Sequence, residues 1–369
     1  MRRFIRVLAL FLLPVFVVCA FFFAAILRSG ELVDTRAAAQ RIADGEDLFI
    51  GLAYRDDTRS IKQFVAAQKK ARLLVLGTSR SMQFRGGFFE TDSFYNAGGA
   101  VAFAPDLLPF LKSLPKESLP ENLLIVLDQY FYNEQWGSED MWPGERDYVF
   151  TDPAPADYLW RAMQNYASGK FSLKSALFPP TDVYGLAAAG RGSGFYSDGS
   201  YSYGQQARDP STGSDAGFSD TYLRISLGTN RFEYGQSVCA FDVEATRDLL
   251  EFCQNNDVQV TAILPPYAPS VWQRMQESGQ YGYIQQILPV LSPLFAQYGA
   301  EIFDYTYLPE TEDAQYIDGF HGSDRVYAAV CLRLSQDSAL LSSYFEPEKL
   351  NALFTAPGVP CLTSLTENN

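Results

Sequence analysis

The first apolar segment of the chain is an uninterrupted run over residues 7–27. These 21 positions carry no charge, and a helix of this length extends roughly 30 Å, the thickness of a bilayer core. Basic residues flank the run on both sides: Arg2, Arg3, Arg6 and Arg28. Because positive charge favours the cytoplasmic side, we expect a single-pass anchor in the cell membrane, with residues 1–6 in the cytoplasm and the rest extracytoplasmic.

A cleavable signal peptide is the alternative interpretation of this run. Ala24 and Ala25 supply the small residues that a cleavage site needs. The apolar core is longer than the roughly 7–15 residues typical of a signal, however. The pattern therefore favours an anchor that stays attached.

Short apolar runs of strand length recur after the anchor, with helical patterns between several of them. The runs cover residues 73–76, 93–96, 123–127, 258–264 and 301–305, and the helical patterns cover 104–114, 243–255 and 270–298, the last with a glycine break. Strands that are apolar throughout and separated by helices predict a parallel sheet covered on both faces. We expect an α/β fold, a three-layer αβα doubly wound sheet of flavodoxin-like order, with its active site at the carboxyl ends of the strands.

Residues 133–238 break this pattern with a long segment rich in aromatic residues, glycine and serine. We interpret the segment as an insertion, either a lid that contacts glycans through its aromatic rings or a surface that packs onto the main domain. The expected organisation is then a tail over 1–6, an anchor over 7–27, a stem over 28–70, a catalytic domain over 71–350 with the insertion inside it, and a C-terminal tail over 351–369.

The charge and the cysteine content of the chain exclude some classes of partner and site. The formal net charge of −14 argues against nucleic acid as a partner, because the phosphate backbone would repel the chain. Four cysteines lie beyond the anchor, without the spacing of a zinc site: Cys239, Cys253, Cys331 and Cys361. An extracytoplasmic location permits disulfides among them, and the spacing leaves their pairing open. We expect no metal and no other cofactor.

The candidate chemistry rests on one serine and on the only histidine of the chain. Ser79 follows the first predicted strand, and His321 follows the fifth, with Asp318 three positions before it. A nucleophile, a base and an acid that orients the base have these residue types. Each residue also has a purely structural interpretation, since Ser79 and Asp318 could cap helices and His321 could be a satisfied core or surface histidine.

Four short blocks together resemble the SGNH hydrolase superfamily (GDSL-like esterases): Gly77-Thr78-Ser79, Tyr95-Asn96-Ala97-Gly98-Gly99, Leu127-Asp128-Gln129-Tyr130-Phe131 and Asp318-Gly319-Phe320-His321. The resemblance covers about residues 70–345. It is closest to the membrane-anchored branch that includes the D-alanyl transfer protein DltD and alginate acetylation proteins. The third block departs from the usual G-x-N-D motif.

The resemblance implies a role for each matching residue. Ser79 would be the nucleophile, with His321 and Asp318 as its base and orienting acid. The backbone N–H groups of Ser79 and Gly98 would form the oxyanion hole, and Gln129 replaces the usual asparagine as a side-chain donor. The absence of a G-x-S-x-G elbow disfavours the α/β-hydrolase fold.

The function expected from these roles is a serine esterase or O-acyltransferase that acts on acyl groups of cell-surface glycans or polymers, as in polysaccharide modification of the cell envelope. The family branch further implies a membrane-bound O-acyltransferase as partner. Arg80 and Tyr267 are candidate substrate-binding residues, although a solvated helix face and core packing are their structural alternatives.

Two other classes of function stay open on the sequence. A non-catalytic glycan-binding or envelope-assembly protein could keep this fold, and the altered third block favours that alternative. Metal-assisted hydrolysis is remote, because one histidine among scattered carboxylates is a poor transition-metal site.

Overall fold

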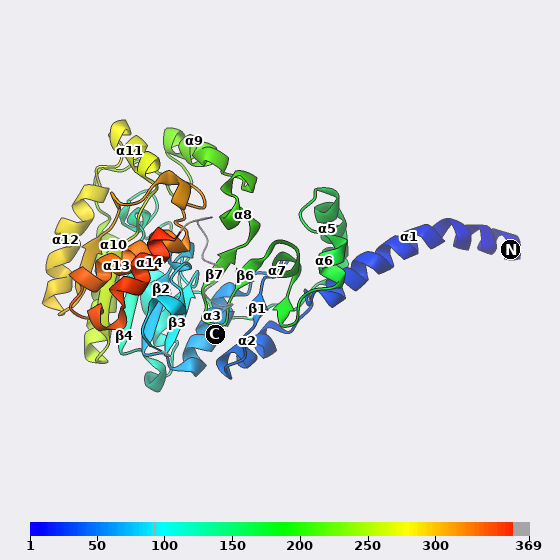
Figure 1. Cartoon of the computed structure of the whole chain (residues 1–369), viewed down its shortest axis with the longest axis horizontal. Coiled ribbons are helices and arrows are strands. Elements are labelled where there is room, and N and C mark those ends of the chain that lie inside the picture. Colours follow the sequence, from blue (N-terminus) through cyan, green and yellow to red (C-terminus); the bar gives the residue numbers. More distant parts are fainter. Residues whose placement is uncertain (92, 357–369) are drawn as a thin grey trace. The chain divides into compact units, whose positions relative to one another are not determined.

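The computed structural model of the chain describes residues 1–91 and 93–356. The chain forms two compact units, shown in Figure 1. Unit 1 contains Met1–Asp57, Phe150–Ser197 and Ser202–Gly204. Unit 2 contains Thr58–Val149, Asp198–Tyr201 and the chain from Gln205 onward.

Unit 2 is built on a parallel sheet of five strands in the order β3-β2-β4-β8-β9. The strands are β2 (Leu73–Gly77), β3 (Phe94–Gly98), β4 (Asn122–Val126), β8 (Gln259–Leu264) and β9 (Glu301–Asp304). Each lies within two residues of a predicted run, which confirms the predicted α/β fold with a parallel sheet. Every residue of β2, β3 and β4 is buried, so both faces of these strands are covered, as expected for strands between two helical layers.

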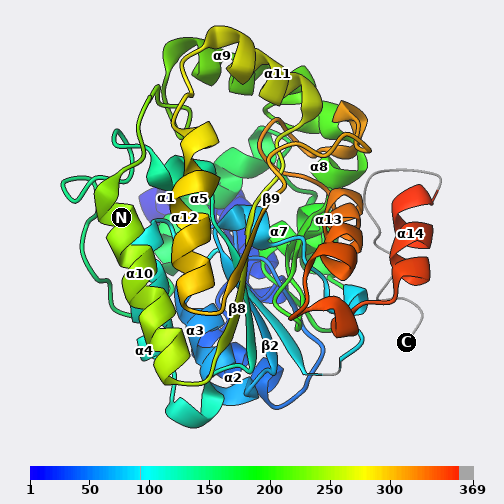
Figure 2. The same cartoon turned by 90° about the vertical axis from the view of Figure 1, so that its left-hand side faces the viewer.

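Helices cover both faces of this sheet. Figure 2 shows α10 and α12 on one side of the strands and α13 on the other. The α-helices of unit 2 are α3 (Thr58–Lys69), α4 (Leu107–Lys112), α8 (Gln205–Arg208), α9 (Ser219–Leu227), α10 (Ala240–Asn255), α11 (Pro269–Ser278), α12 (Ile284–Gln297), α13 (Asp324–Asp337) and α14 (Pro347–Thr355). The break expected inside 270–298 occurs at Gly279, whose positive φ of 65° ends α11.

The strand order determines where a site can form. The chain runs from β2 outward to β3 and then crosses to the other side of β2 to form β4. In open parallel sheets, ligands bind beyond the carboxyl ends of the strands on either side of such a reversal. The segments that follow β2, β3 and β4 therefore lie at one edge of the sheet. These segments contain the ends of the first three sequence blocks.

Unit 1 contains the N-terminal helix α1 (Arg2–Arg28) and a small sheet in the order β5-β1-β6-β7. The sheet strands are β1 (Phe49–Ile50), β5 (Val183–Tyr184), β6 (Ser193–Phe195) and β7 (Tyr201–Tyr203). The other α-helices of the unit are α2 (Thr35–Ala43), α5 (Pro155–Ala167), α6 (Leu173–Leu177) and α7 (Leu186–Arg191).

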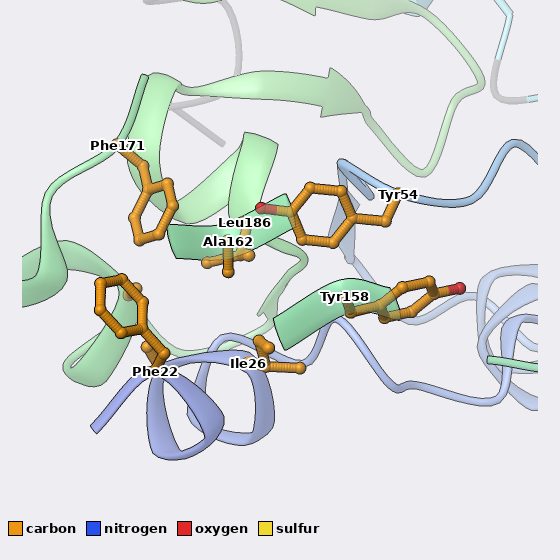
Figure 3. Close-up of a cluster of buried hydrophobic side chains, with 9 residues drawn as sticks. Phe22, Ile26, Tyr54, Tyr158, Ala162, Phe171 and Leu186 are labelled. Carbon is orange, nitrogen blue, oxygen red and sulfur yellow. The ribbon is translucent and has the colours of Figure 1, made fainter. Parts of the chain in front are cut away.

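The helix α1 is long and apolar enough to cross a membrane, a property that a signal sequence would share. Residues 2–21 are exposed or half-buried, but the end of the helix enters the core of unit 1. Phe22, Ala25 and Ile26 are buried in one apolar cluster with side chains of α5, α6 and α7, seven of whose members are labelled in Figure 3. The last two turns of α1 thus belong to the folded unit.

The two units divide the chain differently from the predicted boundaries. The helix α3 lies in the predicted stem but belongs to unit 2, and residues 150–197 of the predicted insertion join the N-terminal region in unit 1. Part of the predicted tail, from residue 351, is helical in α14, whereas residues 357–369 lie outside the described part of the chain. The cysteines at 19, 239, 253 and 331 are free. Cys361, which we named among the cysteines that could form disulfides, lies outside the described residues.

The buried carboxyl of Asp242, in the first turn of α10, gives a prediction about stability. Burial raises the pKa of Asp242 to about 7, so the folded chain retains a proton that the unfolded chain releases near pH 4. The free energy of unfolding should therefore fall as the pH rises from about 4 to 7. We expect Asp242→Asn to stabilise the protein by roughly 1–3 kcal/mol at pH 8 and by much less at pH 5, measured by urea unfolding.

The matched control is Asp248→Asn, at an exposed position of the same helix. The difference in free energy of unfolding between Asp248→Asn and the wild type should be the same at both pH values. An Asp242→Asn variant whose stability follows the wild-type pH dependence would show that this carboxyl does not carry the effect.

Candidate active site

Ser79 lies in the turn that leaves β2, at the start of a short 3-10 helix (Ser79–Ser81). The cap of this helix is Thr78, whose Oγ1 accepts the N–H of Arg80 at 3.2 Å. The Ser79 hydroxyl is therefore not used as a helix cap. Its Oγ lies 2.9 Å from Nε2 of His321, so the two residues predicted as nucleophile and base are in hydrogen-bond contact across 242 positions of sequence.

Asp318 lies on the other side of the imidazole. Its Oδ2 is 2.9 Å from Nδ1 of His321, and its Oδ1 accepts the backbone N–H groups of Phe320 and His321 at 2.8 and 2.7 Å. Burial alone would raise the pKa of Asp318, but the imidazole of His321 and these two N–H groups lower it to about 2. The carboxyl is therefore ionised at neutral pH. It accepts hydrogen bonds both from the backbone of the turn and from the imidazole ring. The N-cap position of the following helix α13 is Ser323, so Asp318 does not cap this helix.

The charge of Asp318 determines which histidine nitrogen carries the proton. An ionised carboxylate only accepts hydrogen bonds, so Nδ1 of His321 must be the donor to it. In the neutral ring, Nε2 is then an acceptor and receives the Ser79 hydroxyl. This chain of hydrogen bonds is poised to move a proton from the serine to the imidazole.

The loop that carries Asp318 and His321 is held by a residue that the sequence did not indicate. The Asp215 carboxylate accepts the N–H of Gly319 at 3.0 Å and the hydroxyl of Thr221 at 2.6 Å. A Cβ at Gly319 would lie 2.6 Å from the Thr221 side chain, so a larger residue would push the loop out of place. Asp215 is more than 100 positions from Asp318, and no local pattern distinguishes it from the other acids.

The second block places a structural asparagine beside the predicted oxyanion residue. Asn96 is fully buried, and its Nδ2 donates to the carbonyls of Ser81 and Phe84 at 2.9 and 2.8 Å, which connects β3 to the turn that carries Ser79. Its Oδ1 accepts the N–H of Gly98 at 2.6 Å. The Gly98 donor is thus engaged in this structure, whereas the Ser79 N–H has no acceptor among the described residues.

The third block supplies a buried support for the same turn. Nε2 of Gln129 donates to the carbonyl of Pro265 at 2.8 Å and to Thr306 at 2.9 Å, and its Oε1 accepts from Arg80 at 2.8 Å. The side chain predicted as an oxyanion donor is therefore fully bonded within the protein. Asp128, next to it, accepts from Thr78 at 2.5 Å and from Arg80 at 3.0 Å.

The two predicted substrate-binding side chains lie in the interior. Arg80 is 1% exposed, and its guanidinium donates to the carbonyls of Pro265 and Pro266 in addition to Asp128 and Gln129. Tyr267 is fully buried, and its ring lies 4.4 Å from the Arg80 guanidinium carbon. Both side chains are therefore buried structural residues of the site. This differs from the prediction that they contact substrate.

Another arginine, Arg231, lies on the aromatic side of the site. Its guanidinium carbon is 5.5 Å from the ring of Tyr130 and 5.8 Å from the rings of Trp136 and Phe320. The Phe320 ring in turn contacts the His321 ring edge to face at 5.2 Å. The backbone N–H of Arg231 donates to Oε1 of Glu233 at 3.2 Å. No sequence pattern pointed to Arg231, because it lies in a loop far from each block.

Comparisons of the chain with protein-family models, curated proteins and solved structures found no match. Among residues 1–91 and 93–356, no cluster of three or more His, Cys, Asp or Glu side chains has the arrangement of a metal site. The chemistry that this arrangement offers is proton transfer between a serine hydroxyl and an imidazole oriented by a carboxylate.

Because Arg80 is buried, its substitution can distinguish a structural role from a role in substrate binding. Arg80→Lys replaces a planar fork of donors by one ammonium, which leaves acceptors of the buried network unpaired. We expect a loss of about 2–4 kcal/mol in the free energy of unfolding, measured by urea titration in detergent.

The control is Arg333→Lys, which alters a surface pair with Glu310 in which the arginine is 41% exposed. This change should cost less than about 1 kcal/mol. If Arg80→Lys instead leaves stability unchanged and raises only KM, then Arg80 binds substrate and the structural interpretation is overturned.

Proposed function

We propose that this protein is a membrane-anchored serine esterase or O-acyltransferase of the SGNH type, acting on acyl groups of cell-surface glycans or polymers. The single observation that carries the proposal is the hydrogen-bonded series from Ser79 through His321 to Asp318 at the carboxyl end of β2. The four sequence blocks that resemble the DltD-like branch supply the substrate class, which is an expectation from that resemblance.

The proposed mechanism begins with attack of Ser79 Oγ on the ester carbonyl. His321 takes the hydroxyl proton on Nε2 and returns it to the leaving alcohol, while Asp318 stabilises the imidazolium. The product is an acyl-serine, which either water or a sugar hydroxyl then cleaves. A membrane-bound O-acyltransferase that delivers the acyl group is the proposed partner.

The Ser79 N–H is the first proposed donor to the tetrahedral oxyanion. The Gly98 N–H is the second, and to act it must exchange Asn96 Oδ1 for the substrate oxygen. Each such donor contributes on the order of 10² to 10³ in rate. Gln129 is left out of the proposed oxyanion hole, because its amide is bonded to Pro265 and Thr306.

The experiment that tests the proposal is covalent labelling of the full-length protein in detergent with a fluorophosphonate probe, followed by mass spectrometry. We expect one adduct, on Ser79, and hydrolysis of p-nitrophenyl acetate. Ser79→Ala should abolish the adduct, and Ser79→Ala or His321→Ala should lower kcat by at least about 10⁴.

The control for labelling is Ser226→Ala, at an exposed position on α9, which should label as the wild type does. Circular dichroism of each variant checks that it is folded. A folded wild-type protein that forms no adduct and hydrolyses no ester would favour the alternative, a non-catalytic glycan-binding or assembly protein.

A second prediction concerns the anchor. Cleavage near Ala24 or Ala25 would separate Phe22 from Ile26, although both are buried in the core of unit 1. Since losing a buried aromatic side chain costs about 3–5 kcal/mol, we propose that α1 is retained. Intact-mass measurement of membrane-extracted protein should give the uncleaved chain, and a mass that corresponds to a mature chain beginning near residue 25 would contradict this.

A further inference from the structure

The helices α5 and α6 pack directly on the last two turns of α1. The Phe22 ring meets the Tyr166 ring edge to face at 5.4 Å, and Nε of Arg28 donates to the carbonyl of Leu177 at 3.3 Å. Figure 1 shows α5 and α6 beside this end of α1, and Figure 3 shows Phe22 close to Phe171, in the segment that connects them. The contact therefore extends along α1 from Arg28 back to Phe22.

The position of Phe22 within α1 gives the depth of this contact. The inference rests on the proposed role of α1 as a membrane span that ends at Arg28. Phe22 lies six positions before Arg28, which corresponds to about 9 Å along a helix. A side chain that packs on Phe22 then lies below the level of Arg28, in the zone of lipid headgroups and the first acyl carbons.

The segment that contains α5 and α6 has the composition that this zone favours. Three of its aromatic side chains are exposed: Trp160 and Tyr166 of α5 by 64% and 45%, and Phe178, which follows α6, by 72%. Tryptophan and tyrosine concentrate at membrane interfaces, where the ring is shielded and the polar atom stays hydrated.

The charge of this segment complements a membrane surface. Residues 155–178 carry three basic residues, Arg161, Lys170 and Lys174, against one acid, Asp157, in a chain whose net charge is −14. Arg161 donates to the carbonyl of Tyr54 at 3.0 Å, whereas Lys170 and Lys174 are exposed and match the phosphates of anionic lipid headgroups.

We propose that the α5–α6 hairpin is a lipid-binding surface, inserted into the headgroup region beside α1. Trp160, Tyr166 and Phe178 enter the interface, and Lys170 and Lys174 contact lipid phosphates. The membrane thus holds unit 1 through two elements, the span and the hairpin. Binding of lipid by this hairpin is independent of the acyl chemistry at Ser79.

The test uses the full-length protein in vesicles of phosphatidylglycerol and phosphatidylcholine whose acyl chains carry bromine near the headgroup. Bromine quenches only tryptophans within contact of the lipid. We expect wild-type emission to fall in brominated vesicles and Trp160→Phe to lose this quenching. The control is Trp272→Phe, on α11 in unit 2, which should retain it. Tyr166→Trp in the Trp160→Phe background should restore lipid quenching at the deeper position.

Quenching of Trp160 by aqueous iodide and not by bromolipid would overturn the proposal, because the hairpin would then face water. Protection from both quenchers would also overturn it and would indicate a protein covering the surface. Alkaline carbonate extraction separates this result from failure of the anchor. Protein that resists extraction without lipid quenching contradicts the hairpin alone, whereas extracted protein contradicts the span itself.

Discussion

The buried ion pair of Arg80 and Asp128 is the interaction on which the candidate site depends. Arg80 follows β2, Asp128 follows β4, and the carbonyls of Pro265 and Pro266 that Arg80 also binds follow β8. One guanidinium thus joins the ends of three neighbouring strands. Removing a charge from water is costly, and the cost is offset here by the hydrogen bonds of both terminal nitrogens of Arg80 and by the faces of Tyr267 and Phe320. Because Ser79 is adjacent to Arg80, this pair restrains the turn that carries Ser79.

Rigidity of this kind suits nucleophilic catalysis, in which a small misplacement of the serine costs orders of magnitude in rate. Asn96 adds a second restraint by bonding the carbonyls of Ser81 and Phe84 from β3. Asp215 adds a third by holding the turn that carries the imidazole. The hydroxyl and the imidazole are each fixed by buried polar groups on separate elements, so their 2.9 Å contact does not depend on one flexible loop.

The strands and the three residues Ser79, Asp318 and His321 were predictable because their signals are local. An apolar run of five residues predicts a buried strand wherever it occurs, and a unique histidine needs no alignment to attract attention. The roles of Arg80 and Gln129 were not predictable, since a charged or amide side chain next to a nucleophile has the same sequence whether it points to solvent or into the core. The division of residues 133–238 between two units was also hidden, because it depends on which distant segment covers the apolar faces of α5 and α6.

The continuity of α1 has a mechanical consequence. A domain tethered by a flexible linker samples a volume set by the linker length, and its distance from the membrane varies with it. In this chain no linker separates the proposed span from unit 1, because the same helix that contains Pro14 and Phe22 ends inside the apolar cluster. A change in bilayer thickness that tilts the helix would therefore rotate unit 1 with it. The orientation of unit 1 would therefore depend on the thickness of the membrane that holds the helix.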